Sequence, residues 1–233
     1  MPILKPGEIY ATKWEVLVYG APGIGKTTLF APAPNVLYIE VDDNGHIVLQ
    51  DHQDRDDFTI FYTRSWLELA GFVKALSTSN LIKTKDLIVV DTISECQTLQ
   101  RLKEIGGDPL TDEKWRLNQS VYAVNNFRVQ ALIRALKQCN KSVAWLCHET
   151  TDLIGKDQQE KLVRPALSAT LLSAVQAGID GQFYYRRDGM NRILETDGTG
   201  QVQTKSRFAK SRPLVNPTWA ILSELLTSRM RHS

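Results

Sequence analysis

The sequence has no long apolar run, few cysteines and almost no net charge, and these features exclude several classes of protein. No stretch of the 233 residues approaches the roughly 18–20 consecutive apolar residues of a membrane-spanning helix, so no membrane partner is expected. The short, polar N-terminus MPILKPGEIY is not expected to be a secretory signal. Cys96, Cys139 and Cys147 are an odd set without metal-ligand spacing, which predicts reduced thiols in a cytoplasm.

The net charge of +2 is unevenly distributed along the chain. Residues 31–60 carry seven acids against one arginine, whereas the last 33 residues carry six basic residues against Glu224 alone. A basic C-terminal segment could bind the phosphates of nucleic acid or of a neighbouring subunit's nucleotide, or it could only keep the chain in solution.

Apolar runs bounded by turn residues alternate with helical patterns as far as residue 180, without an internal repeat. This alternation predicts an α/β fold in which helices flank a mostly parallel central sheet. Strands are expected at 14–20, 35–41, 57–63, 86–91 and 142–148. Helices are expected near 65–77 and over 118–140, the longest.

The pattern changes after residue 180, where short strands and turns at Asp188-Gly189 and Asp197-Gly198 predict a β-meander. No domain boundary is visible. The chain is therefore expected to form one domain over 1–233, with a nucleotide core at about 14–180 and the meander and basic segment at about 181–233.

Residues 19–28 read YGAPGIGKTT and contain the phosphate-binding pattern G-x-x-x-x-G-K-[ST] between an expected strand and an expected helix. Lys26 should reach the β- and γ-phosphates, and the Thr27 hydroxyl should bind Mg²⁺. Pro32 and Pro34 should keep the helix very short. The residues expected to bind ATP are Gly20, Ala21, Pro22, Gly23, Ile24, Gly25, Lys26, Thr27 and Thr28.

Candidate catalytic side chains follow three of the expected strands. Asp91, after LIVV, should hold Mg²⁺ directly or through water. Thr92 stands where many P-loop loaders and AAA+ machines have a water-activating Glu. Asp42 is therefore the candidate that positions water, because it lies at the carboxyl edge of the sheet, although the acidic loop could be merely solvated. His148 could sense the γ-phosphate or be an ordinary structural histidine.

Two polar, glycine-containing segments, 106–116 and 150–165, should also lie at the nucleotide edge of the sheet. They offer cations and a stacking ring, which suit single-stranded DNA, or they are ordinary surface loops with the ring in the core. The expected DNA contacts are Lys114, Trp115, Arg116, Lys156, Lys161 and Arg164.

Six segments together, VYGAPGIGKTT, LYIEVDDNG, LIVVDT, WLCHE, RPAL and TKSRF, resemble the phage-encoded RecA-like single-strand annealing ATPases. The resemblance spans about residues 14–212. It implies a RecA-like P-loop NTPase core in which strand 142–148 lies between the phosphate-loop strand and the Asp91 strand. It also implies ATP at the carboxyl edge, loops that touch single-stranded DNA, and the cytoplasm of a bacterial host.

The same resemblance implies that Lys205 and Arg207 reach the γ-phosphate of a neighbouring subunit in a homo-oligomer, a ring or a filament. A single-stranded-DNA-binding protein is a further expected partner. Asp42 departs from the Glu that is usual in this family, so slow hydrolysis is expected. No separate polymerisation domain is expected before the core, so filament formation does not carry over from the resemblance.

These observations predict an ATP- and Mg²⁺-dependent protein that binds single-stranded DNA, anneals or pairs strands, and hydrolyses ATP slowly. A nucleotide or small-molecule kinase would need an arginine-rich lid, and residues 100–165 hold no arginine cluster. An AAA+ helicase or replication loader is disfavoured by Thr92. A scaffold that binds ATP without turnover remains open because of Asp42.

Overall fold

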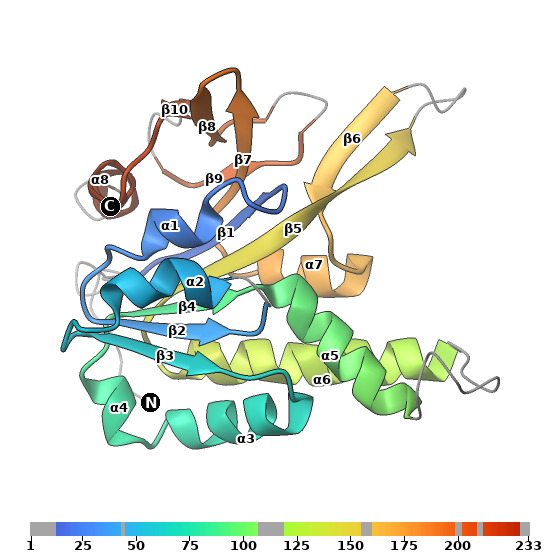
Figure 1. Ribbon diagram of the computed structural model, residues 1–233. Coiled ribbons are helices and arrows are strands. Elements are labelled where there is room, and N and C mark those ends of the chain that lie inside the picture. Colours follow the sequence, from blue (N-terminus) through green and yellow to red (C-terminus); the bar gives the residue numbers. More distant parts are fainter. Residues whose placement is uncertain are drawn as a thin grey trace, which may run out of the picture.

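A mixed β-sheet forms the centre of the molecule, and helices cover both of its faces (Figure 1). The computed structural model describes residues 13–42, 45–106, 119–154, 160–198, 202–208 and 212–228. The parallel strands are β3 (Phe58–Tyr62), β2 (Val36–Glu40), β4 (Leu87–Asp91), β5 (Ser142–Ile154), β1 (Glu15–Gly20) and β7 (Gly181–Asp188), in that spatial order. The α/β fold class and the place of β5 between β1 and β4 are both confirmed.

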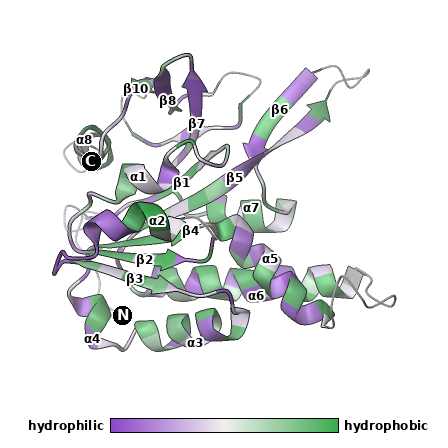
Figure 2. Cartoon of the chain, in the orientation of Figure 1, coloured by the Kyte–Doolittle hydropathy of each residue, from purple (hydrophilic) through white to green (hydrophobic). Residues whose placement is uncertain are grey.

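The central strands are buried on both sides, as parallel strands between two helical layers must be. Every residue of β2 and β4 is buried, and alternate residues of β1 enter different cores. Leu17 packs into one core, whereas Val16 and Val18 pack into the other. Figure 2 shows the central strands as mostly hydrophobic and the upper part of β7 and β8 as hydrophilic.

One face of the sheet is covered by α1 (Lys26–Phe30), α2 (Gly45–Leu49) and α8 (Trp219–Ser228). Helix α1 is as short as Pro32 and Pro34 predict. The sequence did not predict α8, whose Trp219 ring lies 5.9 Å from the ring of Phe30 and 6.4 Å from that of Trp14. The 3₁₀ turn η1 (Gln50–His52) follows α2.

The other face is covered by α3 (Trp66–Leu76), α5 (Ile93–Ile105), α6 (Gln119–Gln138) and α7 (Ala169–Gln176), and α4 (Asn80–Lys83) follows α3. The predicted helices correspond to α3 and α6, and α6 is the longest that the structure describes. Helix α5 was not predicted. Its start is fixed by the Thr92 side chain, which accepts a hydrogen bond from the Glu95 N–H and so caps the helix. None of the described helices has the length and apolarity to cross a bilayer.

The prediction of a loop over 150–165 is wrong where the structure describes this segment. Strand β5 continues to Ile154, beyond the sheet, and pairs antiparallel with β6 (Glu160–Pro165). The alternation was hidden in the sequence because both faces of this ribbon are partly exposed and carry polar residues. Most of the predicted loop 106–116 lies outside the described residues.

The expected meander forms, but its strands pair in a different order from their order in the chain. Strand β8 (Asn191–Glu195) pairs with β7 across the predicted turn, where Gly189 has a φ of +57°. Strand β9 (Lys205–Ser206) returns to the start of β7, and β10 (Leu214–Val215) pairs with β8. The phosphate-loop strand β1 thereby has the C-terminal strands directly beside it.

Candidate nucleotide-binding site

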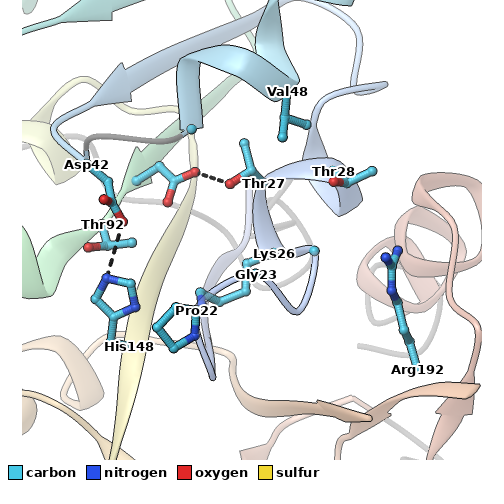
Figure 3. A pocket seen from close by; sticks show the side chains of 13 residues that line it. Pro22, Gly23, Lys26, Thr27, Thr28, Asp42, Val48, Thr92, His148 and Arg192 are labelled. Atoms are coloured by element: carbon cyan, nitrogen blue, oxygen red, sulfur yellow. Dashed lines mark hydrogen bonds and ion pairs between the residues drawn. The ribbon is translucent and has the colours of Figure 1, made fainter. Parts of the chain in front are cut away.

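A pocket of about 350 Å³ opens at the carboxyl ends of β1, β2 and β4, where β5 leaves the sheet (Figure 3). It gathers most of the side chains that the sequence singled out for nucleotide chemistry. The lining residues are Pro22, Gly23, Gly25, Lys26, Thr27, Thr28, Asp42, Gly45, Val48, Asp91, Thr92, His148 and Arg192. This is the edge of an open α/β sheet at which ligands bind.

The phosphate loop joins β1 to α1 and wraps around the side chain of Lys26. Lys26 is 5% exposed, and its Nζ donates to the carbonyl oxygens of Gly20 (2.8 Å) and Ala21 (2.9 Å). Burial lowers the pKa of Lys26, while nearby Asp91 opposes this. A Cβ on Gly20 would lie 2.1 Å from the carbonyl oxygen of Tyr185, so only glycine fits where β7 approaches the loop.

Thr27 and Asp91 come together as a magnesium site requires. The Thr27 hydroxyl donates to Asp91 Oδ2 at 2.6 Å. Burial raises the pKa of Asp91 to about 6, although the Thr27 hydrogen bond and Lys26 act in the opposite direction. The described residues contain no cluster of three or more metal-binding His, Cys, Asp or Glu side chains. The Thr27–Asp91 pair nevertheless fits Mg²⁺, which usually takes one or two protein oxygens together with phosphates and water. The Asp91–Thr92 peptide is cis.

Asp42 and His148 form a side-chain pair that the sequence did not predict. His148 Nε2 lies 3.2 Å from Asp42 Oδ2, and the two side chains are 23% and 27% exposed. The backbone N–H of His148 donates to Ser94 Oγ, which also bonds the hydroxyl of Thr92 at 3.0 Å. His148 Nδ1 is buried and has no hydrogen-bond partner among the described residues. The pair therefore links the end of β2 to the point where β5 leaves the sheet.

Glu40 adds a third carboxyl group beneath this pair. It is opposite Asp91 in the β2–β4 register and is fully buried. Its carboxyl oxygens lie so close to Gly45 that a Cβ there would approach them to 2.2 Å. Burial, together with the charges of Asp91 and Asp42, raises the pKa of Glu40 to about 9. Glu40 therefore holds its proton at neutral pH.

Arg192 is a pocket residue that sequence reasoning missed. It lies on β8, and its Nη1 would be 3.1 Å from a Cβ added to Gly25. In Figure 3 its guanidinium lies beside the phosphate loop, on the side away from Asp42 and His148. The signal in the sequence was a run of arginines around the Asp188-Gly189 turn. Only the pairing of β7 with β1 brings that turn to the loop.

A model of the AAA domain family matches residues 12–208, most of the chain. The chain belongs to the AAA domain family. P-loop ATPases of this family generally use ATP and Mg²⁺, which agrees with the pairing of Thr27 and Asp91 beside Lys26. A search of curated proteins found no match.

Lys205 and Arg207 of this AAA domain lie far from their own chain's phosphate loop. Strand β9 pairs with the first residues of β7, which are level with Val16 near the start of β1. Lys205 Nζ donates to the Gln176 carbonyl oxygen at 3.0 Å, and Arg207 Nη1 lies 3.8 Å from Asp180 Oδ1. Both residues therefore sit at the amino edge of the sheet, opposite the pocket.

The expected DNA contacts fall on the β5–β6 hairpin or outside the described residues. Lys161 is exposed on β6. Arg164 forms an ion pair with Asp152, and its Nη1 donates to the carbonyl oxygens of Pro165 and Leu167, so it braces the hairpin. Lys114, Trp115, Arg116 and Lys156 lie outside the described residues.

Proposed function

We propose that this protein is a slow, RecA-like ATPase that binds single-stranded DNA and anneals or pairs strands under the control of ATP. One observation carries the proposal: His148 lines the nucleotide pocket, pairs with Asp42, and is followed directly by the β5–β6 hairpin. The loss of the γ-phosphate can thus alter the position of His148 and, through it, that of the hairpin.

The hydrolytic half of the proposal assigns a role to each pocket residue. Thr27 and Asp91 would hold Mg²⁺, which neutralises charge on the β- and γ-phosphates. Lys26 binds the same two phosphates as a point charge. Asp42 accepts a hydrogen bond from the attacking water and orients it toward the γ-phosphorus. As the new O–P bond forms, the bond to the β–γ bridging oxygen breaks and the proton of the water passes to an oxygen of the departing phosphate, giving ADP and phosphate. His148 holds Asp42 in place and contacts the γ-phosphate.

The DNA-binding half rests on the form of the hairpin. Beyond His148, β5 and β6 project from the sheet as a two-stranded ribbon (Figure 1). Leu153 is 56% exposed on this ribbon, and Lys161, its partner in the register, is also exposed. An apolar surface beside a cation suits unpaired bases and their phosphates.

The position of Lys205 and Arg207 supports a role between subunits. Because they lie at the edge opposite the pocket, a head-to-tail neighbour could present them to the γ-phosphate of this chain. A ring or filament of this protein, acting on DNA coated with a single-stranded-DNA-binding protein in a bacterial cytoplasm, is the assembly that we propose.

The proposal is tested by titrating fluorescent single-stranded DNA with the protein in the presence of ATP–Mg²⁺, ADP–Mg²⁺ or no nucleotide. Phosphate release and the annealing of complementary strands are followed in the same samples. We expect ATP to strengthen binding, salt to weaken it steeply, and duplex DNA to bind less well. Lys26→Ala should remove the ATP effect. No binding to any DNA at low salt with ATP present would contradict the proposal.

A helicase or replication-loader ATPase is the second candidate, because the family match to the AAA domain is equally compatible with it. Such a protein would separate a forked duplex or deliver a partner to DNA while hydrolysing ATP. Strand separation without annealing would favour this candidate over ours.

A further inference from the structure

A second cation, besides Lys26, faces the phosphate loop from the same chain. Arg192 lines the pocket and reaches the loop at Gly25, the residue that precedes Lys26. Gly25 has a φ of +102° and no side chain, so the guanidinium can lie directly against the backbone. A larger residue at this position would keep Arg192 away from the loop.

Arg192 is held in place by its backbone and by a neighbouring ring. Its N–H donates to Asn216 Oδ1 at 2.8 Å, and its carbonyl oxygen accepts from the Asn216 N–H at 2.6 Å. The Tyr185 hydroxyl, on the adjacent strand β7, is hydrogen-bonded to the Arg192 side chain. The arginine is therefore positioned before any ligand binds.

The neighbouring arginines of the hairpin differ from Arg192 in their partners. Arg186 forms ion pairs with Glu195 and Asp188. Arg187, opposite Arg192 in the register, is exposed and does not line the pocket. Within the described part of the chain, no carboxylate forms an ion pair with Arg192. Its charge is thus directed at the pocket and is not neutralised by the protein.

The two sides of the pocket distinguish the two ends of a triphosphate. Thr27, Asp91 and the Asp42–His148 pair mark the magnesium and γ-phosphate side. Arg192 lies on the opposite side, toward Thr28 (Figure 3). In loops of this type the backbone N–H groups hold the α- and β-phosphates. The guanidinium has two parallel N–H donors that match phosphate oxygens.

We propose that Arg192 binds the α- and β-phosphates of the nucleotide held by its own chain. This inference rests on the proposed function, because it requires that the pocket bind ATP. It divides the phosphate-binding side chains of the site by position: Arg192 serves ADP and ATP alike, whereas His148 and the neighbour's Lys205 and Arg207 act only on the γ-phosphate. Arg192 thus sets affinity for the nucleotide but not the preference for ATP over ADP.

The test compares the affinities of Arg192→Ala, Arg192→Lys and wild type for ADP and ATP by calorimetric titration with Mg²⁺. Loss of a charged hydrogen bond to phosphate should weaken binding about tenfold or more. We expect this factor to be the same for both nucleotides. Arg192→Lys keeps the positive charge but lacks the two parallel N–H donors, so its nucleotide affinity should lie between those of Arg192→Ala and wild type. Arg187→Ala is the matched control and should bind within about twofold of wild type.

Three results would overturn the inference. The first is a folded Arg192→Ala variant whose affinities for ADP and ATP are within about twofold of wild type. The second is a loss of affinity in Arg192→Ala for ATP alone. The third is an equal loss of nucleotide affinity in Arg187→Ala. Thermal melting confirms that each variant is folded. If Arg192→Ala does not fold, Arg192→Lys decides, and wild-type affinity for both nucleotides in that variant counts against the inference. Failure of the wild-type protein to bind either nucleotide would instead overturn the proposed function itself.

Discussion

At the scale of single residues, two carboxyl groups line the pocket and a third lies buried close to them. Asp91 is bonded to Thr27 at the magnesium side, Asp42 is paired with His148, and Glu40 is buried below them. A third charge so close to the other two would oppose their ionised forms. Burial and the neighbouring carboxylates raise the pKa of Glu40 to about 9, which keeps a third negative charge away from Asp91 near neutral pH.

Asp42→Glu should increase the rate of ATP hydrolysis by on the order of tenfold, because water placement is sensitive to shifts of ~1 Å. The longer side chain gains about one C–C bond of reach toward the γ-phosphate. Steady-state phosphate release at saturating ATP measures the change, with ADP affinity as the control. Slower turnover with intact binding would mean that the pair with His148 already fits Asp. Wild-type turnover in both Asp42→Glu and Asp42→Ala would remove Asp42 from the mechanism.

Glu40→Gln should make the stability of the fold less dependent on pH. The pKa of Glu40 is raised from 4.5 to about 9, so the folded chain keeps a proton that the unfolded chain releases between these values. Wild-type stability therefore falls as pH rises through this window, and the variant lacks this loss. From pH 6 to pH 9, wild type should lose at least about 1 kcal/mol more than the variant.

Urea denaturation without nucleotide or Mg²⁺ measures this difference. The exposed Glu224 supplies the matched control, because Glu224→Gln should leave the pH dependence of wild type unchanged. Parallel pH profiles for wild type and Glu40→Gln would show that Glu40 is ionised in the folded protein.

At the scale of elements, the β5–β6 hairpin is the extension of a buried strand beyond the sheet. Up to Cys147, β5 is buried between β1 and β4. His148 is partly exposed and still pairs with Gly20 of β1, and from Glu149 onward β5 pairs only with β6. The Arg164–Asp152 ion pair fixes the two halves of the ribbon. Under the proposed function, a displacement of His148 would be passed along this ribbon.

His148→Ala should keep nucleotide binding but lose the difference in single-stranded DNA affinity between the ATP and ADP states. The side chain that joins Asp42 to the start of the ribbon is removed, while Lys26, Thr27 and Asp91 remain. Fluorescence titration of DNA in both nucleotide states measures the ratio of affinities. His52→Ala, which changes a half-buried histidine away from the pocket, is the control. A ratio equal to that of wild type would rule out His148 as the link.

At the scale of the whole molecule, the phosphate loop and the Lys205–Arg207 segment lie at opposite edges of one sheet. A subunit arranged in this way cannot use both on the same nucleotide. Under the proposed function, like subunits would assemble so that each offers its amino edge to the pocket of the next. Activity would then depend on assembly, and therefore on protein concentration.

Arg207→Ala should lower ATP hydrolysis at least about tenfold while each subunit still binds ATP, since basic fingers contribute ~10³–10⁵ in GTPases. Mixing Lys26→Ala with Arg207→Ala subunits should restore part of the ATP hydrolysis. In such a mixture some subunit interfaces join an intact phosphate loop of one subunit to an intact Arg207 of the next. Arg212→Ala, at an exposed position, is the matched control. Full activity of Arg207→Ala as a dilute monomer would contradict action between subunits.

The sequence by itself determined the features that depend on neighbours along the chain. The phosphate loop needs glycines, a lysine and a threonine in a fixed order. The buried strands β1, β2 and β4 were evident as short apolar runs, and Pro32 and Pro34 limited α1 to one short helix. The place of Asp91 followed from the end of its strand. These features depend on residues close together in the chain, so the spacing of residues along the sequence predicts them.

Only the tertiary structure decided which distant residues meet. Asp42 pairs with His148 because β2 ends, and β5 leaves the sheet, at the same edge on either side of β4. Arg192 reaches Gly25 because β7 joins the sheet next to β1. The outer half of β5 was missed because both of its faces are partly exposed and carry polar residues, so the period of two is not visible until the pairing with β6 is known. Sheet order sets these contacts, and no spacing in the chain encodes it directly.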